Sequence, residues 1–194
     1  MTKNKSKKQE LILNTAKELF WKHGFKRVTV EEICKNAKVS KMTFYKFYTN
    51  KIELAKTVYN NVMQEGIDKF HTVIHEESPA EDKINKLLLL KFESTNNMSI
   101  EFLQDFYADE HLGLKEFIEE KTQEAWKFII DDFIFAQNKG WFRKDVNPEL
   151  FMSISQKLSE LVNDTQLLKL YNSPQELIMA TTNFFIYGLI PHKE

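Results

Sequence analysis

Basic, hydroxyl and aromatic residues between positions 40 and 51 carry the side chains that proteins use to contact nucleic acid. On a short helix with Phe44 facing inward, the outward side chains are those of Ser40, Lys41, Met42, Thr43, Tyr45 and Lys46. Lys41 suits a guanine or a phosphate, and Thr43 suits a base edge or a thymine methyl group. Tyr45 suits a phosphate hydrogen bond, and Lys51 begins the next helix, where amide dipoles and an ammonium both favour an anion.

Two short helices joined by a tight link are needed to present these side chains. Thr29-Val-Glu-Glu32 is a capping box, which predicts a helix that begins there with Thr29 as its cap. Lys38 and Val39 then lead to the helix that Ser40 caps. This spacing is typical of a helix-turn-helix, whose second helix lies in the major groove of DNA. An ordinary three-helix packing with solvated lysines has the same spacing and is the alternative.

The rest of the chain has the periodicity of amphipathic helices, and no alternating stretch is long enough for a sheet. Gly24 and Gly140 stand where helix C-termini favour positive φ. Pro79, Pro148 and Pro174 each follow a capping side chain at a helix start. Besides the two short helices, the pattern predicts helices over about residues 6–23, 50–75, 79–95, 99–110, 113–138, 148–171 and 174–190. We therefore predict an all-α chain of nine helices.

Charge is divided unevenly along the chain. Residues 1–59 contain 14 Lys and Arg against 5 Asp and Glu, a net charge of +9, whereas residues 60–194 have a net charge of −10. Residues 9–59 still have a net charge of +5 when the basic tail, which includes Lys3 and Lys5, is left out. The asymmetry indicates that the first third alone meets a polyanion.

Composition excludes several other classes of protein. The 194 residues include one cysteine, Cys34, so an internal disulfide scaffold is excluded, and five glycines leave little material for phosphate-binding loops. No signal peptide or membrane-spanning run is visible, so we expect a cytoplasmic protein with no membrane partner. No catalytic set of residues rises above chance, and we expect neither catalysis nor a cofactor.

Two weaker signals remain. His71 and His75 are spaced i, i+4 on one helix, a spacing that can bind a metal ion. The sequence identifies no third ligand, so we expect two surface or interface histidines and no metal site. Cys34 is expected to be a small buried apolar side chain and not a redox sensor.

The first third of the chain resembles the tetracycline-repressor (TetR) family of bacterial transcriptional regulators. The likeness covers about residues 9–56 and lies at Ile12, Ala16, Leu19-Phe20, Gly24-Phe25, Val28-Thr29, Ile33, Ala37, Val39-Ser40, Thr43-Phe44-Tyr45, Tyr48, Lys51 and Leu54. It implies a two-domain homodimer, in which residues 1–56 form a three-helix bundle that binds a double-stranded DNA operator. Residues 57–194 would then form a helical domain with a small-molecule pocket and the dimer interface.

Five positions depart from the family pattern. Lys38 stands where the family usually has the glycine of the turn, and a lysine forced to positive φ is strained by about 1 kcal/mol. Val30 replaces a threonine that often contacts phosphate, which leaves Thr29 only as a cap. Phe47-Tyr48 replaces a His-Phe pair, and the bulky Met42 is expected to alter base preference.

Aromatic residues are concentrated in the second part of the chain, where 12 of the 16 Phe follow residue 60. Rings spread over several helices that face one another would suit an apolar or flat aromatic ligand, although plain core packing explains any single ring as well. The candidate pocket residues are Phe92, Phe102, Phe106, Tyr107, Trp126, Phe133 and Phe151. The charge of −10 favours a neutral or cationic ligand over an acidic one.

Two stripes at helical spacing near the C-terminus predict a dimer surface. They consist of Met152, Ser155, Ser159 and Val162 in the first helix and Thr181, Phe184, Phe185, Gly188 and Leu189 in the second. Two such helix pairs would form a four-helix bundle about a two-fold axis, and packing on the chain's own domain is the alternative.

We therefore predict a ligand-responsive transcriptional regulator, a repressor, which binds a palindromic operator as a homodimer and is released by a small-molecule inducer. A protein of the same fold that ignores small molecules, such as an activator or a chromosome-organising factor, is the first alternative. An all-α enzyme or carrier of apolar ligands is the second alternative, and absence of salt-dependent duplex binding would favour it.

Overall fold

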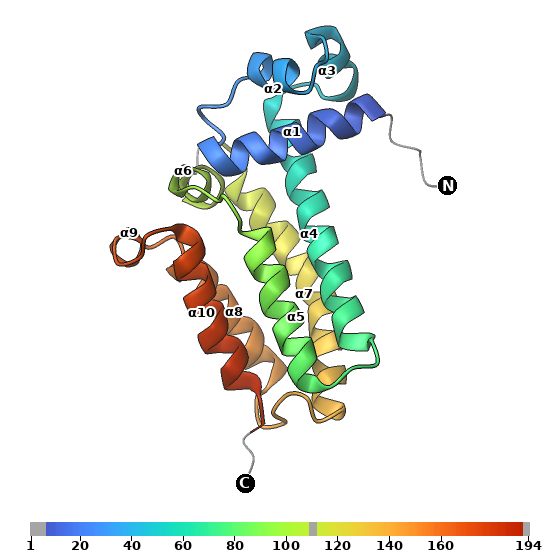
Figure 1. Ribbon diagram of the computed structural model, residues 1–194, viewed down its shortest axis with the longest axis vertical. Coiled ribbons are helices and arrows are strands. Elements are labelled where there is room, and N and C mark those ends of the chain that lie inside the picture. Colours follow the sequence, from blue (N-terminus) through green and yellow to red (C-terminus); the bar gives the residue numbers. More distant parts are fainter. Residues whose placement is uncertain (1–6, 109–111, 192–194) are drawn as a thin grey trace. The chain divides into compact units, whose positions relative to one another are not determined.

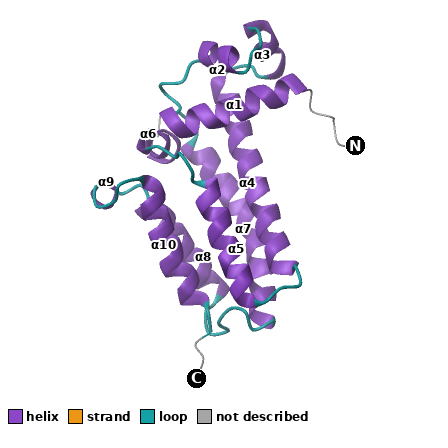
Figure 2. Cartoon of the chain, viewed as in Figure 1, coloured by secondary structure: helices purple, strands orange, loops and turns teal. Residues whose placement is uncertain are grey.

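The computed structural model describes residues 7–108 and 112–191, so Lys3 and Lys5 of the basic tail lie outside the described residues (Figures 1 and 2). The described part contains helices and no strand, which confirms the all-α prediction. Its elements are α1 (Lys7–His23), α2 (Val30–Asn36), α3 (Lys41–Phe47), α4 (Lys51–His75), α5 (Ala80–Ser94), α6 (Ile100–Leu103), η1 (Gln104–Ala108), α7 (Lys115–Asn138), α8 (Pro148–Leu161), α9 (Thr165–Leu168) and α10 (Pro174–Leu189).

Side-chain caps set most of these helix boundaries, as their spacing predicts. Thr29 and Ser40 accept hydrogen bonds from backbone N–H groups in the first turns of α2 and α3, and Asn147 and Ser173 do the same for α8 and α10. For α5, the predicted side-chain cap before Pro79 was wrong, because Pro79 is itself the cap residue and makes no side-chain hydrogen bond. The hydroxyl of Ser78 instead donates to Glu76 at 2.8 Å.

Two expected helices are each divided in the structure, so the expected count of nine is wrong for the described residues. The stretch 99–110 forms α6 followed by η1, a five-residue π-helix, and its last two residues are not described. The stretch 148–171 ends at Leu161 and resumes at Thr165 as α9. The carboxylate of Asp164 accepts hydrogen bonds from the N–H groups of Gln166 and Leu167. These bonds cap the start of α9, and this cap competes with continuation of α8.

The chain folds into two compact units. The N-terminal unit comprises Met1–Val62 and Asn97–Glu119, and the C-terminal unit comprises Met63–Asn96 and Glu120–Glu194. The segment from Asn97 to Glu119 thus packs with the first helices, although the expected functional division at residue 56 would assign it to the second domain. That functional division stays a prediction.

The core of the N-terminal unit is built around α1 and the two short helices. Buried side chains from these helices, from the connection between α1 and α2, and from the start of α4 include Ile12, Ala16, Phe20, Val28, Ile33, Cys34, Phe44 and Leu54. The Cys34 side chain is only 4% exposed, and burial raises the pKa of its thiol, as expected for a small apolar core residue.

The core of the C-terminal unit is largely aromatic. Phe133 of α7 stacks on Phe151 of α8 at 4.1 Å between ring centroids, and Phe185 of α10 stacks on the same Phe151 at 5.4 Å. Ile74, Ala136, Phe142 and Leu189 complete the buried cluster. Among the described residues, no helix is long and apolar enough to cross a membrane.

Candidate nucleic-acid interface

The turn between α2 and α3 keeps the geometry of a glycine turn without the glycine. Lys38 has φ of 54°, in the left-handed region that a lysine enters at a strain of about 1 kcal/mol. The backbone N–H of Lys38 donates to Lys35 O at 3.2 Å, and that of Val39 donates to Cys34 O at 3.0 Å. These bonds hold the turn, so the predicted strain is present in the structure.

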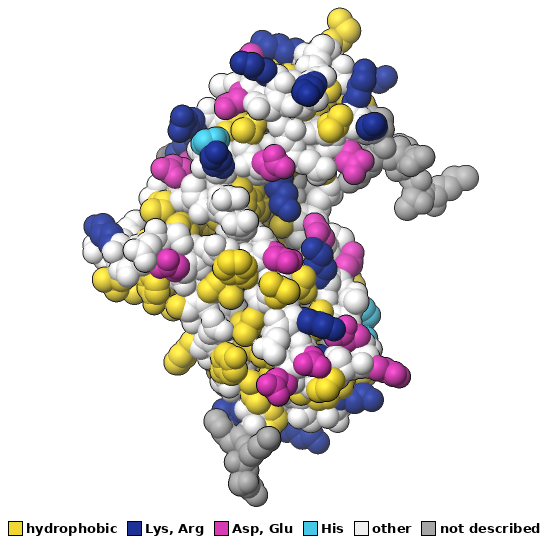
Figure 3. Space-filling view, viewed as in Figure 1, with side chains coloured by type: hydrophobic (Ala, Val, Ile, Leu, Met, Phe, Trp, Pro, Cys, Tyr) yellow, Lys and Arg dark blue, Asp and Glu magenta, His cyan; other side chains and the backbone are white. Residues whose placement is uncertain are grey.

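Helix α3 has a buried side and an exposed side. Phe44 is fully buried, and its ring lies 5.8 Å from that of the buried Tyr48. On the other side, the Met42 side chain is 85% exposed and that of Tyr45 is 56% exposed. Lys41 and Lys46 are exposed as well, and Figure 3 shows several Lys and Arg side chains over α1–α3. The structure therefore brings these four predicted DNA-contacting residues onto one accessible face.

The three predicted hydroxyl residues differ in their hydrogen bonding. Thr29 accepts from the N–H of Glu32 at 3.1 Å, which makes it the cap of α2. Ser40 accepts from the N–H of Thr43 at 3.1 Å, and the two hydroxyls lie 3.0 Å apart. Because the hydroxyls of Ser40 and Thr43 share one hydrogen bond, each fixes the position of the other at the start of α3.

Lys41 forms an ion pair with Glu31 of α2. The Glu31 carboxylate raises the pKa of Lys41, chiefly through their hydrogen bond, and Lys41 in turn lowers the pKa of Glu31. Both side chains are more than half exposed, so water screens the pair strongly. A DNA phosphate would therefore compete with Glu31 for this ammonium at little expense in stability.

Lys51 has a different environment from the one its position at a helix start suggests. Its ammonium donates to the backbone carbonyls of Phe25 and Val28, each at 2.7 Å, and lies 4.1 Å from the centre of the Phe25 ring. Burial lowers the pKa of Lys51. The side chain thus holds the turn between α1 and α2, and its predicted phosphate contact would require these bonds to be exchanged.

Asp105 of η1 holds the same turn from another direction. Its carboxylate is buried, accepts from the N–H of Lys26 at 2.8 Å and lies 3.7 Å from the Lys26 ammonium. A Cβ on Gly24, which has φ of 77°, would lie 2.8 Å from Asp105 Oδ2. Sequence reasoning missed Asp105 and the turn function of Lys51, since neither residue has a spacing motif. The only available signal was one acidic residue within the stretch 102–107, which is rich in aromatic residues.

The candidate pocket residues are divided between the two units. Phe102 and Phe106 are buried in the N-terminal unit, where their rings lie 4.2 Å from Trp21 and 6.1 Å from Phe20 respectively. Tyr107 belongs to the same unit, and burial raises the pKa of its phenol. The remaining candidates, Phe92, Trp126, Phe133 and Phe151, belong to the C-terminal unit.

Three of these four C-terminal candidates form one cluster. The Trp126 ring meets Phe151 edge-on at 5.8 Å, and Phe151 stacks on Phe133. Phe92, by contrast, is 50% exposed. The Nε1 atom of Trp126 is buried and has no hydrogen-bond partner among the described residues. A buried indole N–H normally has an acceptor, so this atom is an unused donor beside the aromatic cluster.

The predicted dimer stripes are only partly exposed. In α10, Phe184 is 84% exposed and Gly188 is exposed, whereas Phe185 is half-buried and Leu189 is a buried core residue. In α8, Met152 and Ser155 are half-buried and Ser159 is exposed, and Val162, the C-cap residue that follows α8, is half-buried.

An exposed apolar stripe on α8 was missed by sequence reasoning. Leu150, Ile154 and Leu161 are 38–50% exposed, and their spacing places them on one face of the helix. Tyr187 of α10 is also 55% exposed, and Figure 1 shows α8 and α10 side by side. The spacing i, i+4, i+11 was available in the sequence as the signal for this face.

Comparison with known proteins shows which regulators this chain is similar to. Residues 12–58 match the bacterial regulatory proteins of the tetR family. The uncharacterised regulator YhgD of Bacillus subtilis is 26% identical over 156 residues, which cover 78% of this chain and 80% of YhgD. DhaS of Lactococcus lactis, described as the transcriptional activator of the dhaKLM operon, is 25% identical over 192 residues, 91% of each chain.

Solved structures share the fold across the whole chain. The fatty acid degradation regulator FadR of Bacillus halodurans aligns with a TM-score of 0.72 and 21% identity, and covers 98% of this chain and 100% of its own. FadR of Bacillus subtilis, solved in complex with stearoyl-CoA, aligns with a TM-score of 0.66 and 18% identity over 93% of this chain and 98% of its own. The exposed α3 face of the capped helix-turn-helix thus lies within the segment, residues 12–58, that matches the tetR family of bacterial regulatory proteins.

Proposed function

We propose that this regulator is a repressor that binds a palindromic operator as a homodimer and leaves it when a small molecule binds. The observation that carries the proposal is the accessible α3 face, where Met42, Tyr45 and Lys46 project from a helix anchored by the buried Phe44. One such helix makes few base contacts, so two copies about one DNA turn apart, roughly 34 Å, are needed for useful specificity.

The dimer is proposed to form through α8 and α10. Phe184, Tyr187, Leu150, Ile154 and Leu161 expose apolar surface on these two helices, and exposed apolar patches on soluble proteins mark interaction sites. The matching surface of a second chain would complete a four-helix bundle about a two-fold axis.

The ligand is proposed to be apolar, neutral or cationic, with a hydrogen-bond acceptor. The aromatic cluster of Trp126, Phe133 and Phe151 supplies apolar contact, and the unpartnered Nε1 of Trp126 supplies the donor. The net charge of −10 on residues 60–194 disfavours an acidic molecule. The stearoyl-CoA of the B. subtilis FadR complex has a long apolar chain, which makes it an informative comparison ligand.

The ligand would control DNA binding by shifting the protein between two conformations. Ligand would favour a conformer in which α4, which begins at Lys51 directly after the helix-turn-helix, holds the two reading helices away from one-turn spacing. By linkage, the ligand must then bind the DNA-bound form more weakly than the free form, by the same factor as it weakens DNA binding.

Selection from a random pool of duplexes tests DNA recognition. We expect a palindrome with half-sites about one turn apart, and a base preference that changes in M42A. In K46Q, the slope of log affinity against log salt should fall by about 0.9, whereas K127Q on α7 should leave it unchanged. Absence of any salt-dependent duplex binding would contradict the proposal and favour the enzyme or carrier alternative.

Sedimentation equilibrium tests the dimer. F184D places a charge on the proposed interface and should convert dimer to monomer, whereas F128D, at a ring that is 63% exposed on α7, should remain dimeric. A monomeric wild-type protein at all concentrations would exclude the operator geometry.

Ligand control is tested with two probes, the flat aromatic cation rhodamine 6G and stearoyl-CoA, added to the protein–operator complex. We expect rhodamine 6G to weaken operator binding more than stearoyl-CoA does, and W126F to reduce its effect because the ring stays and the N–H is lost. The opposite order would overturn the proposed ligand class. No effect of either probe or of a neutral apolar library would favour the alternative without small-molecule control.

An activator is the second candidate, because the activator DhaS aligns over 91% of this chain. A reporter downstream of the selected operator distinguishes the two functions. Expression should rise on deletion of the regulator if it is a repressor and should fall if it is an activator.

A further inference from the structure

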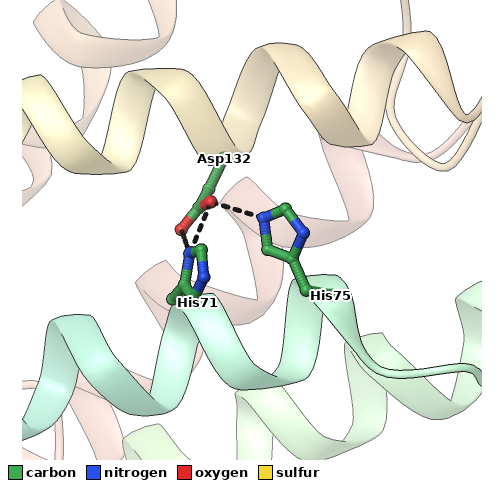
Figure 4. Close-up of side chains that lie close together, drawn as sticks. All are labelled: His71, His75 and Asp132. Atoms are coloured by element: carbon green, nitrogen blue, oxygen red, sulfur yellow. Dashed lines mark hydrogen bonds and ion pairs between the residues drawn. The ribbon is translucent and has the colours of Figure 1, made fainter.

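Two histidines of α4 and one aspartate of α7 come together in the C-terminal unit (Figure 4). His71 Nδ1 lies 2.9 Å from Asp132 Oδ1 and 3.1 Å from Oδ2, and His75 Nε2 lies 2.8 Å from Oδ1. Asp132 is 61 residues from His71 and 57 from His75 in the sequence, which is why the i, i+4 pair had no identifiable third ligand.

We propose that His71, His75 and Asp132 form a binding site for a first-row divalent metal ion, with Zn²⁺ as the best match. One ligand atom from each residue lies within 4.8 Å of the others. Tetrahedral zinc with bonds of about 2.0–2.2 Å separates neighbouring ligand atoms by roughly 3.3 Å. The nitrogen-to-oxygen distances of 2.8 and 2.9 Å therefore need to widen by only about half an ångström.

The electrostatics of Asp132 favour a cation at this position. Its side chain is 7% exposed, and the hydrogen bonds and ion pairs found for it among the described residues are those with the two histidines. A neutral histidine supplies an N–H but no permanent positive charge, and a buried carboxylate is normally paired with a charge or bound to a metal. A divalent ion would replace the shared protons and supply that charge.

The ligand rings are already held in place. His75 stacks on Phe135 of α7 at 4.1 Å, and the His71 ring lies 4.2 Å from the His75 ring. Packing of this kind fixes ring orientation before an ion arrives, which lowers the entropic cost of binding. The His71 side chain is 61% exposed, so an ion has a path from solvent.

The donor set narrows the choice of ion. Two imidazoles and one carboxylate suit Zn²⁺, Co²⁺, Ni²⁺ or Cu²⁺, whereas Mg²⁺ and Ca²⁺ prefer oxygen ligands. Three protein ligands leave a fourth position for water or another small ligand, as in open zinc sites. The ion would bridge α4 and α7.

Calorimetric titration of the tag-free, metal-stripped full chain with Zn²⁺ tests the proposal without DNA or inducer, so its outcome is independent of the proposed function. We expect one ion per chain at pH 7.5. Co²⁺ should give the visible absorption bands of a four-coordinate complex.

Matched variants locate the ion. D132N should weaken Zn²⁺ binding at least a hundredfold, and H71A, at an exposed ligand, should do so at least tenfold. D131N removes the same charge from the neighbouring exposed residue, and H23Q removes a histidine from α1, so both should bind Zn²⁺ as wild type does. Circular dichroism checks that D132N is folded, and H71A provides the same test if it is not. Equal affinity in wild type, D132N and H71A, or the absence of Zn²⁺ binding, would overturn the proposal.

Discussion

Aromatic rings pack in both units and a lysine binds backbone carbonyls in both, but the two units differ in the contacts at the centre of their predicted functions. In the N-terminal unit, the turn between α1 and α2 is fixed by charged groups that bind backbone atoms, namely the Lys51 ammonium and the Asp105 carboxylate. In the C-terminal unit, stacked rings of Phe133, Phe151 and Phe185 form the centre of the packing. Directional hydrogen bonds fix one geometry, which would suit the proposed DNA-reading helix, whereas ring packing would tolerate rearrangement around the proposed ligand.

The comparison predicts the largest loss of stability for a change in the aromatic core. F133A removes a fully buried ring and should lower the free energy of unfolding by about 3–5 kcal/mol. F128A, at an exposed ring of the same helix, should change it by less than about 0.5 kcal/mol. Urea unfolding measures both, and equal effects would show that the Phe133 cluster does not stabilise the unit.

We expect a smaller loss of stability when the turn between α1 and α2, which Lys51 and Asp105 hold, is distorted. G24A forces positive φ on alanine and places Cβ 2.8 Å from Asp105 Oδ2 and 2.9 Å from Glu101 Cβ, so we expect a loss of about 2–4 kcal/mol. Gly140 has the same φ of 77° with open space around it, so G140A should cost only about 1 kcal/mol. Equal losses in urea unfolding would mean that η1 does not constrain the turn.

Variants of Lys51 and Lys46 distinguish a side chain that holds a turn from one that contacts DNA phosphate. K51M leaves the Phe25 and Val28 carbonyls without their donor and should cost about 1–3 kcal/mol, while the salt dependence of DNA binding stays unchanged. K46M should do the reverse, with unchanged stability and a salt slope smaller by about 0.9. Thermal unfolding and DNA titration at several salt concentrations give the two readouts. A normal stability of K51M with a reduced salt slope would restore the predicted phosphate contact.

The smallest expected effect is a gain in stability. K38G relieves the positive φ of the helix-turn-helix link and should stabilise the protein by about 1 kcal/mol. Asn97 has a similar φ of 58°, but asparagine tolerates this region, so N97G should give a smaller gain. A loss of stability in K38G would show that the lysine side chain contributes more than its backbone strain removes.

Local signals in the sequence predicted much of the N-terminal unit. The caps at Thr29 and Ser40 and the buried Phe44 depend on residues within about four positions of one another, so periodicity and capping rules predict them. The strain at Lys38 was expected from the family resemblance instead. The same rules failed at Asp164, because a residue that caps a new helix and one that lies within a continuous helix have the same local pattern.

The candidate pocket shows why long-range packing was not predictable. Phe102 and Phe133 have the same residue type and the same helical periodicity, yet one packs in the N-terminal unit and the other in the C-terminal unit. Apolar burial is non-directional, so a hydrophobic pattern states that a ring is buried without stating against which helix. The exposure of Leu150, Ile154 and Leu161 was not predictable for the same reason, because a core face and an interface face of a helix have the same apolar composition.

By itself the sequence determined the helical class, the two capped helices with their outward lysines, and the separation of charge between the first third and the rest. Each of these depends on neighbours in the chain or on composition. Only the tertiary structure decided that Lys51 and Asp105 hold one turn and that Asp132 meets His71 and His75. Residues 57 or more positions apart meet only after helices pack, and no local spacing encodes which helices will be neighbours.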